Sequence, residues 1–188
     1  MEQYNKYRWF YTSSGKKVVG GKSATQNDEL LKEITSEKEK YYVMHTSSPG
    51  SPFSVILAKM NQVTEKDLEE CAVFTGCFSK EWKAKKKEAR IDIFISEQLS
   101  KDKEMKEGMW RVKGEVKHKT VKLELVLIKQ KGILRAVPGA TSKKFIVKII
   151  PGNIEKQDAL IKIQTGTSVK LDSEQFLSAI PAGGIKII

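Results

Sequence analysis

The sequence predicts an α+β fold: a mainly antiparallel sheet packed with two or three helices, plus a small β-rich C-terminal α/β segment. Three observations favour it. Short aromatic and β-branched runs alternate with Gly, Ser and Pro turns, which is typical of antiparallel strands. Two longer segments carry apolar residues at helical spacing behind a Ser or Thr N-cap. The composition shifts after Lys131 and Gly132, so we expect one domain over residues 1–131 and a smaller one over residues 132–188.

The strands expected in the first domain begin with a hairpin. Aromatic residues fill positions 7–12, Ser13-Ser14-Gly15 forms a turn, and positions 16–19 return as the second arm. Further strands are expected at residues 41–45, 53–58, 91–96, 109–114 and 119–128. We expect the last two of these to pair with each other and to close the domain.

Two helices are indicated by their N-terminal caps. Ser23 and Gln26 fit a capping box, and leucine and isoleucine follow at helical spacing. Thr64 caps a second helix, which we expect to reach about Glu81. The basic run beyond it is either a continuation of that helix or its solvated end. The buried face of that helix is expected to consist of Leu68, Cys71, Phe74 or Thr75, Phe78 and Trp82.

The C-terminal segment alternates strands with short helices. Strands are expected at residues 133–137, 144–150 and 185–188, and helices at residues 154–164 and 173–179. The simplest structural interpretation is a small β-rich unit that buries one face on the main domain.

Composition favours a polyanionic partner and gives little support to metal or membrane chemistry. The formal net charge is +11 with a pI near 9.5, which suits nucleic acid, although lysines in this number can also be simply solvated. The apolar runs are too short to span a bilayer and no signal region precedes Tyr7. Two cysteines without a CxxC motif and two distant histidines predict neither a metal site nor a cofactor. We expect a cytoplasmic protein.

The candidate site is the stretch from Tyr7 to Leu57. Gln26 and Asn27 start a helix after two glycines, and they either cap that helix or bind an anion at its N-terminus. His45 ends a strand beside a rigid Ser/Pro/Gly loop that contains Ser51. His45 is either structural or a hydrogen-bond partner for phosphate or a base. The stretch offers no carboxylate or cysteine suited to assist it as a general base.

Basic side chains gather in three groups that could contact phosphate rather than sequence. One group surrounds the helix start, one follows the second helix, and one lies on the expected closing hairpin; the alternative is that these lysines are solvated. Together with Gln26, Asn27, His45 and Ser51, the candidate nucleic-acid-binding residues are Arg8, Lys16, Lys17, Lys22, Lys80, Lys83, Lys85, Lys86, Lys87, Arg90, Arg111, Lys113, Lys117, His118 and Lys119.

An ordered set of motifs resembles a known family. It comprises Arg8-Trp9-Phe10, Gly20-Gly21, Gln26-Asn27-Asp28, His45, and Gly50-Ser51-Pro52. The set is similar to the signature of NFACT-R, the RNA-binding domain of the NFACT ribosome quality-control factors, and would extend over residues 6–129. ILRAVPG, FIVKIIPG and FLSAIPAGGIKI resemble a shortened NFACT-C.

The resemblance implies a non-enzymatic protein that binds RNA. The expected partners are tRNA or rRNA, the large ribosomal subunit, and a separate protein that carries the NFACT-N domain, because the family's N-terminal domain has no counterpart here. Two alternatives stay open. One is an RNA-processing nuclease that uses His45 with basic residues, although no suitably spaced carboxylates are present. The other is a module that binds ribosomal proteins through the isoleucine-rich C-terminal segment.

Overall fold

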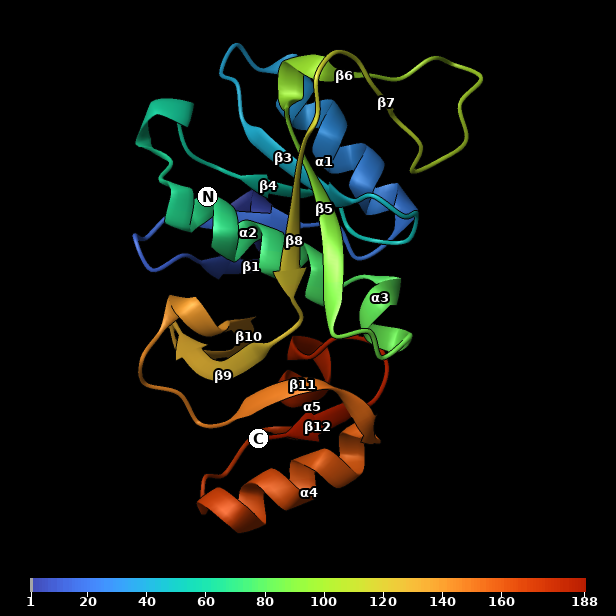
Figure 1. Cartoon of the computed structure of the whole chain (residues 1–188). Helices are drawn as coiled ribbons and strands as arrows, with labels where there is room; N and C mark the ends of the chain where they lie inside the picture. The colour runs from blue at the N-terminus through green and yellow to red at the C-terminus, as the bar shows by residue number, and fades with distance from the viewer. Residues whose placement is uncertain (1) are drawn as a thin grey trace.

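A six-stranded antiparallel sheet forms the frame of the N-terminal part of the molecule (Figure 1). This computed structural model describes residues 2–188, with side chains from Tyr4 onward. The sheet has the order β1-β2-β4-β3-β5-β8. Its strands are β1 (Arg8–Tyr11), β2 (Lys17–Gly20), β3 (Tyr42–Thr46), β4 (Ser54–Ile56), β5 (Glu88–Ile95) and β8 (Lys117–Lys122). The structure confirms the α+β class and the expected N-terminal hairpin.

Helices cover the two faces of this sheet. Alternate residues along each strand point to opposite faces. Phe10 and Met44 join the core beneath α2 (Glu65–Cys77), whereas Trp9 and Val43 join the core beneath α1 (Ala24–Ser36). Ser23 and Thr64 cap these helices as expected, since each side chain accepts a hydrogen bond from a backbone N–H three residues on.

The second helix ends earlier than the sequence suggested. α2 stops at Cys77, and the short α3 (Lys80–Lys83) begins anew after Ser79, whose Oγ accepts from the N–H of Glu81 at 3.1 Å. Lys85 then adopts a left-handed conformation with φ of 58°. The helix expected to reach about Glu81 therefore ends at Cys77 and does not continue through the basic run, because a new cap and a turn interrupt it.

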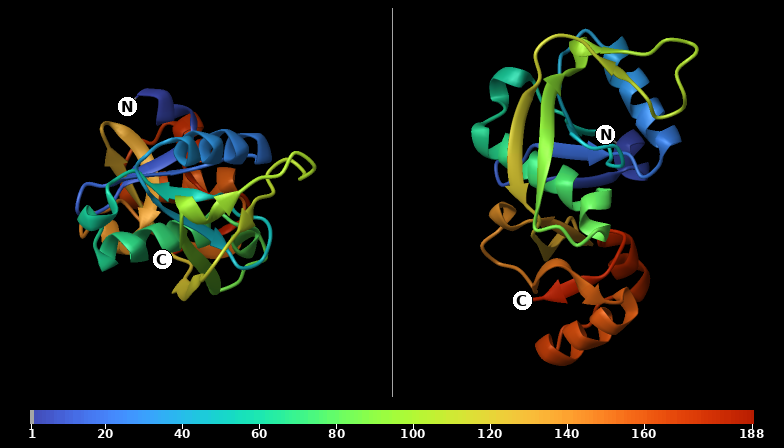
Figure 2. Two further views of the ribbon diagram at one scale, coloured as in Figure 1. Left: turned by 90° about the horizontal axis from the view of Figure 1, so that it is seen from above. Right: turned by 45° about the vertical axis from the view of Figure 1, so that its right-hand side comes forward.

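A second, four-stranded sheet carries the C-terminal part, and it lies below the first sheet in Figure 1 and in the right-hand view of Figure 2. Its order is β10-β9-β11-β12. Its strands are β9 (Leu125–Gln130), β10 (Ile133–Pro138), β11 (Lys148–Ile154) and β12 (Ile185–Ile187), and its helices are α4 (Lys156–Thr167) and α5 (Ser173–Ala179). The remaining elements are β6 (Leu99–Ser100), β7 (Arg111–Val112), η1 (Glu2–Lys6), η2 (Met60–Gln62), η3 (Ser96–Gln98) and η4 (Gly139–Thr141).

The expected closing pair of strands does not form. β7 pairs with β6, β8 pairs with the edge of the first sheet at β5, and β9 pairs with β10 and β11 in the second sheet. The segment expected as one strand over residues 119–128 is thus divided between two sheets. Local propensity predicted strand in both pieces, but it carries no information on which distant strand each would meet.

One hydrophobic core runs through both parts of the molecule. Leu123, Leu125 and Phe176 belong to the same buried cluster as Phe74. Trp82 is fully buried, and its Nε1 donates to the carbonyl of Gly184 at 3.1 Å, which confirms it as a packing residue. The domain boundary expected after Lys131 stays a prediction. The chain passes from the first sheet to the second before that point, because β9 already belongs to the second sheet.

Two further expectations from composition can be compared with the structure. Cys71 and Cys77 are buried and unbonded, and burial raises the pKa of both thiols well above the ordinary value. Both cysteines thus act as small core residues. Among the described residues, no helix has the length and apolarity needed to cross a membrane.

Candidate functional site

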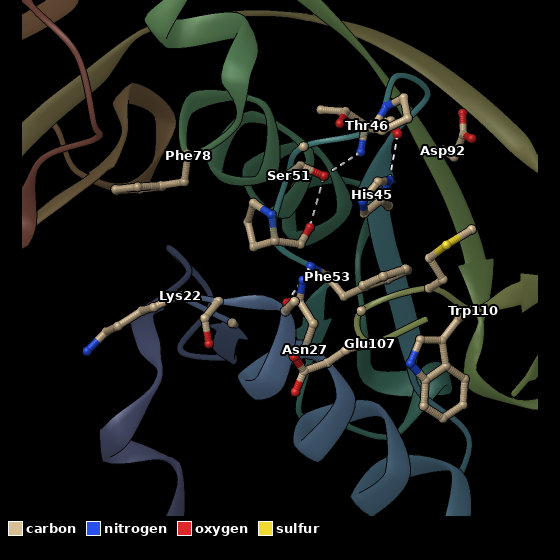
Figure 3. Close-up of a pocket in the computed structure, with 18 of the residues that line it drawn as sticks. Lys22, Asn27, His45, Thr46, Ser51, Phe53, Phe78, Asp92, Glu107 and Trp110 are labelled. Carbon is tan, nitrogen blue, oxygen red and sulfur yellow. Dashed lines mark hydrogen bonds between the residues drawn. The ribbon is translucent and has the colours of Figure 1, made fainter. Parts of the chain in front are cut away.

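A cleft of about 790 Å³ lies between the start of α1, the loop after β3 and the segment before β7 (Figure 3). Five of the sequence-predicted residues line it: Arg8, Lys22, Asn27, His45 and Ser51. They come from β1, the turn before α1, α1, β3 and the following loop. The fold therefore brings together groups that are up to 43 residues apart, as Ser51 is from Arg8.

Asn27 joins the start of α1 to the loop. Its Oδ1 accepts a hydrogen bond from the backbone N–H of Phe53 at 3.1 Å. A Cβ on Gly21 would lie 2.1 Å from that oxygen, so a glycine is required there by close approach rather than by backbone conformation. The Asn27 Nδ2 makes no hydrogen bond within residues 4–188. Asn27 thus has a structural acceptor and a free donor on one amide.

Gln26 serves the helix cap. Its N–H donates to Ser23 Oγ at 3.2 Å, and its Oε1 accepts from the N–H of Lys22 at 3.0 Å. It does not line the cleft. Of the two interpretations that the sequence left open for Gln26, these contacts favour capping.

His45 presents a hydrogen-bond acceptor. Its Nδ1 lies 2.7 Å from the Thr46 carbonyl, and a carbonyl can only accept, so Nδ1 carries the proton. Burial lowers the pKa of His45, against smaller opposing effects of the Thr46 carbonyl and Asp92. The imidazole is therefore neutral at pH 7, and its Nε2 is an acceptor. Such a group suits a ribose hydroxyl or a base N–H better than a phosphate.

Ser51 holds the loop rather than offering a free hydroxyl. Its Oγ accepts from the N–H of Thr46 at 2.9 Å and is placed to donate to the Pro52 carbonyl at 3.1 Å. Gly50 has φ of 110°, and the Lys80 side chain packs over it. The loop beside His45 is thus fixed from both ends, as its Pro and Gly content predicted.

Aromatic rings line the cleft at positions that the site prediction missed. Phe53 packs on His45 with ring centroids 4.5 Å apart. Trp110 is held by its Nε1, which donates to Asp28 Oδ1 at 2.8 Å. Asp28 also accepts from Lys101 and from the N–H of Gly108. The Gly-Met-Trp motif before β7 was the sequence signal that could have pointed to Trp110. The hairpin expected from that motif placed Trp110 away from the candidate site.

A carboxylate that sequence reasoning also missed lies next to His45. Asp92 on β5 is the register partner of both His45 and His118, so the three side chains form a row across one face of the sheet. His118 Nδ1 lies 2.7 Å from Asp92 Oδ1, and the hydroxyl of Ser47 donates to the same oxygen. Only the strand register, which pairs positions 45 and 92, places Asp92 beside His45.

The remaining basic candidates are distributed over several faces. Arg90 and His118 share the His45 side of the sheet, whereas Lys117 and Lys119 point to the α2 side. Three cations have acidic partners, in the pairs Lys86–Glu81, Arg111–Asp102 and Lys119–Glu69. Lys17 lies over the ring of Trp9 at 5.5 Å. The remaining predicted lysines are surface residues outside the cleft: Lys16, Lys80, Lys83, Lys85, Lys87 and Lys113.

The match to a known family covers the elements that build this cleft. Residues 6–114 match the family described as NFACT protein RNA binding domain. The chain is also 30% identical over 200 residues to the archaeal Rqc2 homolog aRqcH of Methanocaldococcus jannaschii, an alignment that covers 98% of this chain and 29% of that protein. The chain thus spans less than a third of that relative.

A solved structure shares the fold. It is the C-terminal part of the fibronectin/fibrinogen-binding protein from Streptococcus suis, with a TM-score of 0.52 and 20% sequence identity, covering 62% of this chain and 44% of that one. At this identity the likeness shows the fold alone. The family match, which covers more than half of the sequence, confirms the resemblance drawn from its motifs. The chain therefore belongs to the NFACT family, through an NFACT RNA-binding domain over residues 6–114.

Proposed function

We propose that this chain is a non-enzymatic RNA-binding module of the translation machinery, and that the cleft around His45 holds a nucleotide of tRNA or large-subunit rRNA. The observation that carries the proposal is the composition of the cleft. Figure 3 shows His45, Trp110 and the carboxylate of Asp92 toward one side of the cleft and Lys22 on the other, and Arg8 also lines the cleft.

This division matches the parts of a nucleotide. His45 Nε2 accepts and Asn27 Nδ2 donates, so the pair can bind a base edge or a ribose 2′-hydroxyl. The ring of Trp110 provides apolar surface for an unstacked base. Arg8 and Lys22 supply positive charge for the adjoining phosphates. Single-stranded or distorted RNA is the expected target, because the edges of bases are hidden in an A-form helix.

The proposed binding partners are based on the name of the archaeal relative. The archaeal protein is named as an Rqc2 homologue, so we propose the large ribosomal subunit as the place of action, in the cytoplasm. A protein that carries an NFACT-N domain is a further proposed partner. The activities of a full-length relative are not assigned to this chain, because it spans 29% of that protein.

Fluorescence anisotropy with labelled tRNA and an rRNA fragment tests the proposal. If about five phosphates are contacted, the log–log dependence of the binding constant on salt should have a slope of roughly −3.5 to −4.5. His45→Ala should weaken binding more than His118→Ala, since His118 lies in the same row of the sheet but outside the cleft. A slope near zero would contradict the electrostatic part of the proposal.

The same samples test whether the module is an enzyme. Labelled tRNA should stay intact with and without magnesium. Cleavage that His45→Ala abolishes would overturn the non-enzymatic assignment and favour the nuclease alternative. Ribosome binding that survives nuclease digestion would instead favour contacts with ribosomal proteins.

A further inference from the structure

Four basic side chains from separate elements converge where the two sheets meet. Arg8 lies on β1 and Lys22 before α1, whereas Arg135 lies on β10 and Lys156 begins α4. Arg135 stacks on Trp9, the residue next to Arg8 in β1, and the charges of the group act on one another. Burial and then the charge of Arg135 lower the pKa of Arg8 to about 10. Burial and then the charge of Arg8 lower the pKa of Lys156, and Lys22 responds to burial and then to both arginines.

No acidic group balances these charges. Within residues 4–188, none of the four side chains forms an ion pair. Every charge that acts on them is another cation of the same group. By contrast, Lys101, which is also partly buried, has an acidic partner in Asp28. Unbalanced positive charge in a partly buried position is costly unless an anion binds there.

The side chains are also held in place. The Arg8 guanidinium lies 4.3 Å from the ring centroid of Phe78, and that of Arg135 lies 3.9 Å from Trp9. Lys156 Nζ lies within 3.5 Å of the carbonyl oxygens of Leu177 and Ile180. Stacking fixes the planes of the guanidinium groups and leaves their edges for hydrogen bonds. The Nε atoms of both arginines are buried without a hydrogen-bond partner.

This arrangement is suited to phosphate. Guanidinium groups bind phosphate oxygens through paired hydrogen bonds, and lysines add point charges. A single carboxylate would neutralise one charge of the four, whereas a diphosphate or two successive phosphates of a strand neutralise several. Arg8 and Lys22 also line the cleft, and Figure 3 shows Lys22 and Phe78 on the side away from Trp110.

We propose that Arg8, Lys22, Arg135 and Lys156 form a phosphate site shared by the two sheets, at one end of the cleft. The C-terminal part of the molecule then has a direct role in ligand binding, because it supplies two of the four cations. The site does not depend on nucleotide binding by His45, since a free diphosphate should occupy it.

Isothermal titration of the full chain with inorganic pyrophosphate tests the site. Lys156→Gln should weaken binding, and its matched control is Lys162→Gln, an exposed lysine of the same helix. Loss of one charge-assisted contact corresponds to about tenfold weaker binding. Lys22→Gln provides a second variant at an exposed position, in case Lys156→Gln unfolds. Lack of saturable binding by the unmodified chain, or equal weakening by Lys162→Gln, would overturn the site.

RNA with and without a 5′-phosphate identifies the source of the anion. A Lys156→Gln effect confined to the 5′-phosphorylated strand assigns the site to a terminal phosphate. An equal effect on both strands assigns it to backbone phosphates. Pyrophosphate binding that His45→Ala leaves unchanged separates this site from the nucleotide cleft, so the two proposals can fail independently.

Discussion

Asp92 lies directly opposite His45 in the antiparallel register of β5 and β3, yet the two side chains hydrogen-bond to different partners. His45 Nδ1 donates to the Thr46 carbonyl at 2.7 Å, whereas Asp92 accepts from Ser47 and lies 2.7 Å from His118. A histidine that acts as a general base is usually oriented by a carboxylate at its second nitrogen. Here a backbone carbonyl takes that place, which leaves the Nε2 of His45 as a hydrogen-bond acceptor and leaves Asp92 to other partners.

The close approach of Gly21 to Asn27 gives a first prediction. Gly21→Ala should lower the free energy of unfolding by about 1–3 kcal/mol, because the new methyl group would overlap Asn27 Oδ1. Gly166→Ala in α4 is the matched control, since nothing lies within 4 Å of its added Cβ. That control should stabilise by up to about 1 kcal/mol. Urea denaturation measures both, and equal effects would contradict the packing constraint.

The two ends of the Asn27 amide can be tested separately. Asn27→Ala removes the acceptor for the Phe53 N–H and should cost about 1–3 kcal/mol of stability, because that donor is buried. Asn27→Asp keeps an oxygen acceptor but loses the free Nδ2 and adds a negative charge. It should retain more stability than Asn27→Ala and still weaken RNA binding. If Asn27→Asp binds RNA normally, Asn27 is structural only.

His45 predicts a pH dependence of stability. Burial lowers its pKa below the ordinary value of 6.5, so the unfolded chain takes up the proton at a higher pH than the folded chain. The stability associated with neutral His45 is fully present above about pH 6.5 and is lost as the pH falls toward the folded-state pKa. Denaturation at about pH 7.5, 6.5 and 5.5 should show this loss, and His45→Gln should reduce it. An unchanged profile in the variant would exclude His45 as the source.

The basic turn after α3 supports a prediction about affinity. Charge reversal of Lys85, Lys86 and Lys87 should weaken binding to all RNA sequences alike, because lysines contact phosphate and not bases. Reversal of Lys86 alone should have the smallest effect, since Lys86 is already paired with Glu81 at 2.6 Å. Anisotropy with two unrelated RNA sequences measures this. Unchanged affinity in the triple variant would show that the turn is a solvated surface.

Local signals in the sequence were sufficient for much of the fold. The capping side chains of Ser23 and Thr64 act on backbone groups within three residues, and α5 begins and ends where its pattern predicted. The NFACT motifs identified the family and four of the five predicted residues that line the cleft: Arg8, Asn27, His45 and Ser51. The caps, the helix bounds and the family motifs depend on neighbouring residues or on an ordered series of motifs, and both can be recognised directly in the sequence.

Only the tertiary structure decided which distant residues meet. Strand periodicity could not place Asp92 beside His45, move β9 into the second sheet, or bring Arg135 to Arg8. Trp110 reached the cleft because Asp28 holds it, across 82 residues of chain. Propensity and capping act over one or two turns of chain, whereas register and packing are selected by the burial of the whole core. The sequence by itself therefore determined the family and the elements, and the packing of those elements determined the site.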